Sequence, residues 1–536
     1  LLTSMLLEFA ERHHGDGEIV SRRVEGDIHR YTYRDLARRS RQLAATLDKA
    51  GLQQGDRVAT LAWNGYRHLE LYFGVTGSGR VVHTLNPRLH PEQLVWIINH
   101  AEDAVLCFDM SFLPLIQAVH AKCPTVKTWV ALCDADKLPE GSGIPNLVSY
   151  EAWIGGASDQ YVWPQFDENS AAGLCYTSGT TGNPKGALYS HRSTVLHAYG
   201  GALPDAMNLS ARDSMMPVVP MFHVNAWGLP YGAALTGCKL VFPGPAMDGK
   251  SLYELMEAEG VTMAAGVPTI WQMLLAHVQG GKLKFSTLTR TVIGGSACPP
   301  AMIDTFREDF GVDVLHAWGM TETSPLGSVS TLKNKHLKLP AAQQMAIRVK
   351  QGRAICGVDM RIVGDDGQEQ PWDGKTYGDL QVRGPWVMAS YFKGQSPLVT
   401  DQNGVRWFPT GDVATIDADG YMQITDRSKD VIKSGGEWIS SIDIENIAMA
   451  HPAIAMAACI GMPHPKWDER PIVAVVTKPG AEVTREELLK FYEGRTAKWQ
   501  IPDDVVFVEA IPLGATGKML KTKLRELLKD YKLPTS

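Results

Sequence analysis

The sequence has no hydrophobic run long enough to cross a bilayer, and its first residues lack the basic segment that opens a signal peptide. It has no excess of positive charge: the formal net charge is −6, which argues against a nucleic-acid partner. The eight cysteines lack Cys-x-x-Cys spacing and mostly lie in apolar runs, so we expect buried thiols and neither disulfides nor a zinc site. Internal repeats and low-complexity tracts are also missing. These absences predict a soluble globular protein of a reducing compartment, the cytoplasm, without integral membrane association.

The first part of the chain, to about residue 330, alternates short β-rich runs with helical patterns. This alternation predicts the α/β class, with parallel sheets covered by helices. A chain of 536 residues is too long for one hydrophobic core, so several such units are expected. The predicted strands are residues 57–63, 104–109, 128–134, 215–223, 239–243, 262–267 and 291–295, with helices such as 35–50 and 251–259 between them.

The pattern changes after about residue 346, where short strands follow one another closely. Residues 365–367 (Asp-Asp-Gly) and 417–420 (Asp-Ala-Asp-Gly) are typical hairpin turns, so a small antiparallel β-barrel is expected. From about residue 426 helix and strand alternate again. We therefore predict a large N-terminal part at 1–425, with sheet subdomains to about 345 and the barrel at 346–425, and a small α+β C-terminal domain at 426–536.

Residues 176–186, Tyr-Thr-Ser-Gly-Thr-Thr-Gly-Asn-Pro-Lys-Gly, form the most informative segment. An apolar run at 171–175 predicts a strand before it, and residues 193–207 predict a helix after it. Backbone N–H groups of such a loop, its hydroxyls and Lys185 together suit a polyphosphate. A Walker A loop is excluded, because that motif needs Gly-Lys-Ser/Thr, whereas here Pro184 precedes the lysine and Gly186 follows it.

The loop resembles the phosphate loop of the adenylate-forming superfamily, which includes acyl-CoA synthetases, adenylation domains of peptide synthetases and beetle luciferases. Five further segments resemble motifs of that family and occur in the family's order. They are the adenine and metal motif at 318–323, the ribose motif at 407–412, the hinge at 426–430, the C-terminal loop at 433–439 and the catalytic-lysine motif at 514–518. The resemblance implies two helix-covered sheets and a barrel, followed by a mobile C-terminal domain.

The resemblance also implies a reaction in two halves. A carboxylic acid first attacks ATP, giving an acyl-adenylate and pyrophosphate, and coenzyme A then displaces AMP to give a thioester. ATP and coenzyme A would be co-substrates and Mg²⁺ the metal ion, with Glu322 as its carboxylate ligand. By resemblance, the nucleotide would be bound by Thr177, Ser178, Gly179, Thr180, Thr181, Gly182, Lys185, Gly295, Ala317, Trp318, Gly319, Met320, Asp412 and Arg427.

Four residues carry the catalytic expectations. Lys518 is expected to bridge the attacking carboxylate and the α-phosphate, because an ammonium group can stabilise both as charge shifts. Thr321 would hold the α-phosphate beside Glu322. His223 either gates the tunnel or packs as a core histidine, and the sequence leaves both open.

The C-terminal motifs imply a domain rotation between the half-reactions. Lys429 matches the family's hinge position. One orientation would bring in Lys518, and the other would bring in the loop that binds coenzyme A. That loop holds Lys433, Gly435, Gly436, Glu437 and Trp438, and its glycines would leave room for the pantetheine arm.

The acyl pocket is implied to lie beside residues 222–228 and 294–297. Val224, Trp227 and Gly294 are its predicted substrate contacts, although the sequence does not distinguish an inward-facing Trp227 from a core residue. Amino-acid-selecting members carry an Asp after the His, where this chain has Val224 and Asn225. This difference argues against a substrate that bears an ammonium group.

We therefore predict an acid:CoA ligase. Residues 426–440 resemble the fatty acyl-CoA synthetase branch, bacterial medium-chain members in particular. The chain is also similar to 3-methylmercaptopropionate:CoA ligases of dimethylsulfoniopropionate breakdown, so the predicted acid is 3-methylmercaptopropionate or a short- or medium-chain fatty acid. A homodimer is expected on family grounds. The alternatives are an adenylation enzyme that feeds a carrier protein, a luciferase, and a binding protein that has lost the chemistry.

Overall fold

The computed structural model describes residues 1–177, 183–435, 437–514 and 519–534. Its first sheet has seven strands in the order β7-β6-β5-β3-β4-β8-β9, parallel except for β9. These strands are β3 (Arg57–Leu61), β4 (Val81–Thr84), β5 (Val105–Phe108), β6 (Thr128–Ala131), β7 (Leu147–Ser149), β8 (Ala171–Tyr176) and β9 (Gly186–Ser190). The accompanying helices are α2 (Tyr33–Lys49), α3 (Tyr66–Gly77), α4 (Pro91–Ala101), α5 (Leu113–Val119) and α6 (Tyr150–Gly155).

Helix α2 shows how the local sequence determines where a helix begins and which face it buries. Thr32 and Asp35 form a reciprocal capping box, in which each side chain accepts a backbone N–H of the other. Leu36, Leu43 and Leu47 then recur at helical spacing and are fully buried. The helix therefore begins where its first N–H groups find acceptors and turns one apolar face to the core.

The second sheet has nine strands in the order β16-β15-β14-β13-β12-β10-β11-β1-β2. They are β1 (Glu18–Arg22), β2 (Ile28–Thr32), β10 (Ser214–Pro217), β11 (Lys239–Phe242), β12 (Met263–Gly266), β13 (Arg290–Ile293), β14 (Asp313–Gly319), β15 (Leu326–Val329) and β16 (Arg353–Ala354). Its helices are α1 (Thr3–His14), α7 (His191–Ala202), α8 (Val224–Trp227), α9 (Leu229–Thr236), α10 (Gly249–Glu259), α11 (Pro268–Gly280), α12 (Pro300–Asp304) and α13 (Ala341–Arg348). One hydrophobic core contains residues of both sheets and of α1, α2, α3 and α9.

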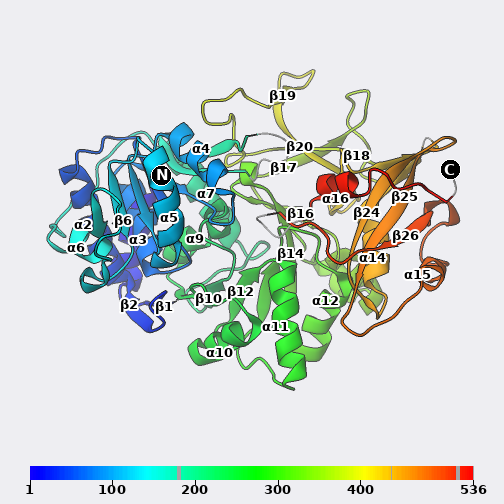
Figure 1. Cartoon of the computed structure of the whole chain (residues 1–536), viewed down its shortest axis with the longest axis horizontal. Helices are drawn as coiled ribbons and strands as arrows, with labels where there is room; N and C mark the ends of the chain where they lie inside the picture. Colours follow the sequence, from blue (N-terminus) through cyan, green and yellow to red (C-terminus); the bar gives the residue numbers. More distant parts are fainter. Residues whose placement is uncertain (178–182, 436, 515–518, 535–536) are drawn as a thin grey trace.

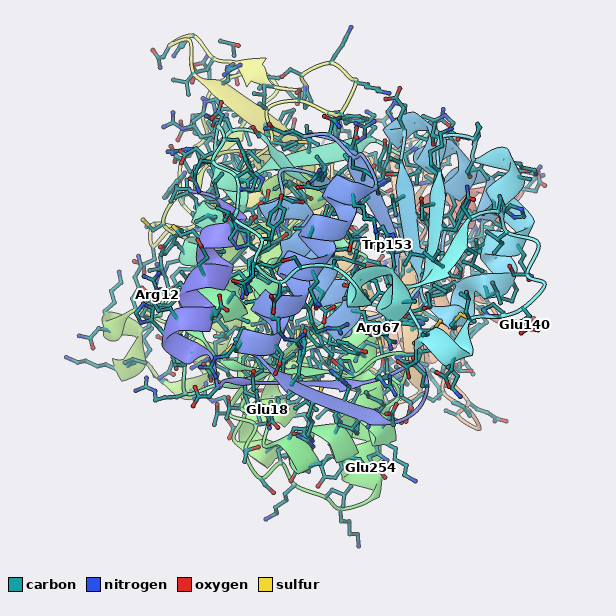
Figure 2. All side chains as sticks on the ribbon, turned by 90° about the vertical axis from the view of Figure 1, so that its left-hand side faces the viewer. Arg12, Glu18, Arg67, Glu140, Trp153 and Glu254 are labelled. Carbon is teal, nitrogen blue, oxygen red and sulfur yellow. The ribbon has the colours of Figure 1, made fainter. Side chains whose placement is uncertain are left out.

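Ion pairs connect the first two sheets at their surface. Arg67 on α3 pairs with Glu25 of the β1–β2 turn at 2.8 Å and with Glu151 on α6 at 2.9 Å. Figure 2 shows Arg67 near the centre of this face, with Trp153 above it and Glu18 below it. The hairpin of the second sheet is thus fastened to the helices of the first.

Every strand predicted in this part has a counterpart, which confirms the α/β class. The helix predicted after the phosphate loop is present as α7, which begins at His191. The prediction that the loop leads directly from a strand into that helix was wrong, because strand β9 lies between them and pairs antiparallel with β8, so the loop joins two strands of a hairpin. The predicted strand at 215–223 also ends early, at Pro217.

A third, antiparallel sheet follows, made of β17 (Asp359–Val363), β18 (Gly378–Arg383), β19 (Val399–Thr400), β20 (Arg406–Ile416) and β21 (Met422–Arg427). Its antiparallel character is as predicted. The strand pairings found among the described residues leave this sheet open, so the predicted barrel is not confirmed.

The last sheet comprises β22 (Ile432–Ser434), β23 (Glu437–Ile439), β24 (Ile454–His464), β25 (Asp468–Thr477) and β26 (Asp504–Phe507). Its helices are α14 (Ser441–Met449), α15 (Arg485–Phe491) and α16 (Lys521–Leu527). Figure 1 shows this α+β unit at the right, with the red helix α16 turned toward the middle of the molecule. In the part of the chain that the structure describes, no helix has the length and apolar character needed to cross a membrane.

Candidate active site

A cavity of about 1080 Å³ lies between the large N-terminal part and the C-terminal unit. Segments far apart in the sequence line it, and they include most of the predicted site residues that the structure describes. The lining set includes Thr177, Lys185, His223, Val224, Trp227, Gly294, Gly295, Ala317, Trp318, Gly319, Met320, Thr321, Glu322, Arg427, Lys429, Leu513, Gly514 and Met519.

The two ends of the phosphate loop are held together at this cavity. The Thr177 N–H donates to the Lys185 carbonyl oxygen at 2.9 Å, and the Lys185 N–H donates to the Thr177 hydroxyl at 3.2 Å. The Lys185 ammonium lies 5.1 Å from the centre of the Tyr391 ring, a cation–π distance. The rest of the predicted phosphate site lies outside the described residues, namely Ser178, Gly179, Thr180, Thr181 and Gly182.

Glu322 is held by a tyrosine that the sequence analysis did not identify. It lies in a short 3₁₀ turn after β14, and the Tyr391 hydroxyl donates to its Oε1 at 2.8 Å. Burial raises the pKa of Tyr391, so this hydroxyl keeps its proton and remains a donor. Tyr189 steadies the same turn by donating to the Thr321 carbonyl oxygen at 2.6 Å.

The surroundings of Glu322 suit Mg²⁺ bound through a nucleotide. Among the described residues, no group of three or more His, Cys, Asp or Glu side chains could hold a metal ion by itself. Mg²⁺ commonly takes one or two carboxylates and completes its shell with water and substrate phosphates. One oriented carboxylate beside the phosphate loop fits that pattern.

Asp412 is fixed between an indole and a guanidinium. Its Oδ2 accepts the Trp318 ring N–H at 3.1 Å, and its Oδ1 lies 3.0 Å from Nε of Arg427. Strands β20 and β21 place Asp412 and Arg427 opposite each other. Asp412 is 2% exposed and is not among the cavity-lining residues, whereas Trp318 and Arg427 on either side of it are. A carboxylate can accept hydrogen bonds from a pair of hydroxyls such as those of a ribose, and this role of Asp412 stays a prediction.

Gly294 and Gly295 make room for an indole. A Cβ atom on Gly294 would lie 2.9 Å from the Ala317 carbonyl oxygen and 3.2 Å from the Trp227 ring. Gly295 has φ of +82°, which also favours glycine. Trp227 is buried and lines the cavity, and His223 lines it as a half-buried residue.

The chain beside these residues takes a left-handed turn that the sequence did not reveal. Val224, Asn225, Ala226 and Trp227 have φ of 47°, 50°, 49° and 57°, and Gly228 follows at 72°. Each non-glycine residue in this conformation costs about 1–2 kcal/mol, so surrounding contacts must maintain it. The Asn225 side chain lies toward Tyr72, Thr84 and Cys175 in the core. Of Val224 and Asn225, the two positions considered for binding a substrate ammonium group, Val224 lines the cavity and Asn225 does not.

The C-terminal unit contributes the segment around the predicted catalytic lysine. Gly514 and Met519 line the cavity, whereas Lys518 itself lies outside the described residues. Lys433 and Gly435 lie away from the cavity: their N–H groups donate to Glu469 at 3.0 Å and to the Trp467 carbonyl oxygen at 2.9 Å. The last predicted members of that loop, Gly436 and the side chains of Glu437 and Trp438, are outside what the structure describes.

Contacts near the predicted hinge join the C-terminal unit to β21. The Ser441 N–H donates to Asp426 at 2.8 Å, and the Ser440 hydroxyl donates to the Thr425 carbonyl oxygen at 2.6 Å. Lys521 of α16 pairs with Glu445 at 2.7 Å. Burial alone would lower the pKa of Lys521, but the Glu445 and Asp426 carboxylates outweigh it and raise that pKa.

Two family models match this chain. One, described as AMP-binding enzyme, matches residues 6–392, and one described as AMP-binding enzyme C-terminal domain matches residues 443–518. The first match covers the cavity-lining segments up to Tyr391, and the second covers Leu513 and Gly514. The lining residues at 410–411, 427–430 and 519–526 lie outside both matches.

Curated relatives match over nearly the whole length. The chain is 55% identical to the 3-methylmercaptopropionyl-CoA ligase of Ruegeria lacuscaerulensis, across 99% of this chain and 98% of that protein. It is 51% identical to the medium-chain-fatty-acid–CoA ligase of Ectopseudomonas oleovorans, across 100% of this chain and 97% of that protein. Among solved structures, ATP-bound MatB from Rhodopseudomonas palustris superposes with a TM-score of 0.82 at 26% identity, covering 99% of this chain and 100% of that one.

Proposed function

The chain belongs to the AMP-binding enzyme family, and from this membership we propose that it is an ATP-dependent acid:CoA ligase. In the first half-reaction a carboxylate oxygen of the acid bonds to the α-phosphorus of ATP, and the bond from that phosphorus to pyrophosphate breaks. In the second, the sulfur of coenzyme A bonds to the acyl carbon, AMP departs with the electron pair of the broken C–O bond, and the thiol proton passes to solvent.

One observation supports this proposal most strongly. The base of the phosphate loop, Glu322, Trp227 and the segment ends Gly514 and Met519 all face one cavity. Transfer of a nucleotidyl group depends mainly on positioning and on neutralising charge, so it needs such residues around one volume. A binding protein without chemistry has no need of this convergence.

We propose the residue roles that the motifs predict. Lys518 would stabilise the charge that shifts between carboxylate and α-phosphate, Thr321 would hold the α-phosphate, and Asp412 with Arg427 would bind the ribose. Glu322 would hold Mg²⁺, which would supply positive charge to offset that of the phosphates. Tyr391 would orient Glu322 toward that ion by its hydrogen bond.

For the acid, we propose 3-methylmercaptopropionate or a short- or medium-chain fatty acid. The names of the two curated relatives support this choice, and so does an indole standing at the glycines of the acyl pocket. The homodimer and the cytoplasmic location predicted from the sequence remain predictions.

A pyrophosphate-release assay with a panel of acids, run with and without coenzyme A, tests the function. We expect acid-dependent pyrophosphate release that turns over only with coenzyme A, together with acyl-CoA detected by mass spectrometry. Adenylate formation that coenzyme A does not discharge, but a phosphopantetheinylated carrier protein does, would favour the carrier-protein alternative. No acid-dependent release with any member of the panel would contradict the ligase proposal.

A further inference from the structure

We propose that Asn64 and Tyr72, which do not line the active-site cavity, are positioning residues that set acid specificity. They would act by holding residues 217–228, here called the acyl-pocket loop, so that residues 224–228 keep their left-handed form. The proposal rests on the acid:CoA ligase function proposed above and adds a specificity determinant to it.

Asn64 fastens the start of the acyl-pocket loop. It follows β3 of the first sheet, whereas the loop follows β10 of the second. Its Nδ2 donates to the carbonyl oxygens of Pro217 at 2.7 Å and of Val219 at 2.9 Å, and its Oδ1 accepts the Met221 N–H at 2.7 Å. Asn64 is 1% exposed, so these three bonds replace water entirely and use both donors of the amide.

Tyr72 fastens the middle of the same loop from helix α3. Its hydroxyl donates to the Met221 carbonyl oxygen and lies 3.4 Å from Oδ1 of Asn225. The Thr84 hydroxyl and the Cys175 thiol approach the same Oδ1, at 3.5 Å and 3.4 Å. Tyr72 is fully buried, and it sits in the first sheet's layer as Asn64 does.

These bonds lie on either side of the residues that face the substrate. Met221 is bonded through both its N–H and its carbonyl oxygen. Four residues later, Oδ1 of Asn225 lies within hydrogen-bond distance of the Thr84 hydroxyl and the Cys175 thiol. His223 and Val224 between them line the cavity, and Trp227 follows two residues after Asn225. A left-handed turn of non-glycine residues persists only where its surroundings enforce it, and the Asn64 and Tyr72 bonds meet that requirement.

The position of the Trp227 indole against Gly294 depends on this turn. If the loop relaxes toward ordinary φ values, the indole moves from the pocket wall and the pocket length is no longer fixed. Glu322 and Asp412, the residues proposed for the metal ion and the ribose, are held by Tyr391 and Trp318, which lie outside the acyl-pocket loop. Loss of the Asn64 or Tyr72 hydrogen bonds should therefore change the relative kcat/KM for different acids and leave ATP binding intact.

The Tyr72→Phe variant tests the proposal with little change of volume, and Tyr33→Phe is its matched control. Tyr33 is also fully buried and also donates to a backbone carbonyl oxygen, that of Cys238 at 2.7 Å, outside the acyl-pocket loop. For each protein, kcat/KM would be measured for a series of saturated acids, together with the KM for ATP. The ratio of kcat/KM between two acids does not depend on the fraction of folded enzyme, so a merely structural role would not move it.

We expect Tyr72→Phe to change the ratio between the best acid and one two methylenes longer by about fivefold or more, with the KM for ATP within about twofold. Tyr33→Phe should leave that ratio within about twofold. Asn64→Asp, which keeps the shape but replaces two N–H donors by a carboxylate oxygen, should shift the ratio further. If the Asn64→Asp protein does not fold, the Tyr72→Phe measurement still tests the proposal.

Two results would overturn the proposal: an unchanged ratio in Tyr72→Phe, or an equal change in Tyr33→Phe. Failure of the ligase proposal itself would look different. The wild-type protein would then show no acid-dependent pyrophosphate release, and no ratio could be formed.

Discussion

The indole of Trp227 stands where a Cβ atom on Gly294 would be 3.2 Å away, and we expect this contact to limit the length of the acid. Each methylene that fits a dry tunnel gains about 0.8 kcal/mol. One that meets packed atoms costs about 1–3 kcal/mol by overpacking. These magnitudes predict an optimum chain length of the acid, instead of a kcat/KM that rises steadily with chain length.

The Trp227→Ala variant should therefore shift the preferred acid to longer chains by a few carbons. The measurement is kcat/KM for saturated acids from propionate to palmitate and for 3-methylmercaptopropionate, in both proteins. A wild-type preference for palmitate, or for an aromatic acid such as coumarate, would refute this account of the pocket. The adenylation chemistry assigned to Glu322 and Asp412 would be unaffected.

Tyr391 is the residue at the nucleotide side that the motifs did not include. Removing its hydroxyl leaves the Glu322 carboxylate without an orienting donor, and a hydrogen bond to a charged group contributes about 1.5–3 kcal/mol. We expect Tyr391→Phe to raise the Mg²⁺ concentration needed for half-maximal rate by about tenfold. Tyr253→Phe is the control, because its hydroxyl donates to the Lys284 carbonyl oxygen at the surface, at 2.9 Å. Equal Mg²⁺ dependence in the two variants would contradict the role of Tyr391.

At the scale of elements, buried apolar runs bounded by turns predicted half of the strands described in the two large sheets, namely β3, β5, β6, β8, β10, β11, β12 and β13. Among the strands that the prediction missed is β9, since the hydroxyl-rich loop before it hid a strand that is recognisable only by its pairing with β8. It could not predict the left-handed turn either, because Val224–Trp227 contains no glycine and its φ values are enforced by Asn64 and Tyr72, more than 140 residues away. Long-range side-chain bonds of this kind leave no local signal.

A buried carboxylate, that of Glu259, connects the β1–β2 hairpin to helix α10 and to strand β11 of the same sheet. The stability that this ion pair contributes depends on pH. Glu259 on α10 pairs with Arg30 of β2 and with Lys239 of β11, the latter at 2.9 Å. The Arg30 hydrogen bond lowers the pKa of Glu259. A carboxyl whose pKa is lower when folded stabilises the protein above its unfolded pKa, and that stability is lost as pH falls through the folded value.

We expect Glu259→Gln to lower the melting temperature at pH 7 by about 2 °C, equivalent to about 1 kcal/mol after allowing for the exposed Arg30. The difference from wild type should shrink as the pH falls below the ordinary glutamate pKa of 4.5 and then through the lower pKa of the folded wild-type carboxyl. Thermal unfolding followed at several pH values checks this. A difference that stays constant or grows on acidification would contradict the assigned ion pair.

At the scale of the whole molecule, sequence motifs identified many of the segments that line the cavity, whereas residues 88–93, Met207, Tyr391 and residues 519–526 line it without belonging to a predicted motif. They could not predict the domain orientation, because it depends on tertiary contacts such as those of Ser440 and Ser441 with β21. The structure places Gly514 and Met519 at the cavity and the loop of Lys433 and Gly435 away from it. We propose that this arrangement serves the first half-reaction and that the C-terminal unit moves for the second.

Lys518→Ala should then abolish adenylate formation from acid and ATP and largely spare thioester formation from pre-made acyl-adenylate. Losing a charge that stabilises the transition state costs about 3 kcal/mol or more, about a hundredfold in rate. Lys529→Ala, an exposed lysine of the same segment, is the control. Equal loss in both half-reactions would refute the assignment.

Gly436→Leu should have the opposite effect. The neighbouring Gly435 has φ of +61°, and a Cβ there would lie 2.8 Å from the Trp467 ring, so this loop has little room for side chains. A leucine in the predicted pantetheine path should leave single-turnover pyrophosphate release intact and block the thioester. Gly480→Leu in the same domain is the control, since a Cβ on Gly480 meets nothing within 4 Å and its φ of +74° makes the substitution a test of backbone strain alone. Pyrophosphate release and acyl-CoA yield would be measured with and without coenzyme A. Normal acyl-CoA formation by Gly436→Leu would show that coenzyme A enters by another path, whereas a block shared with Gly480→Leu would trace the loss to backbone strain and not to the tunnel.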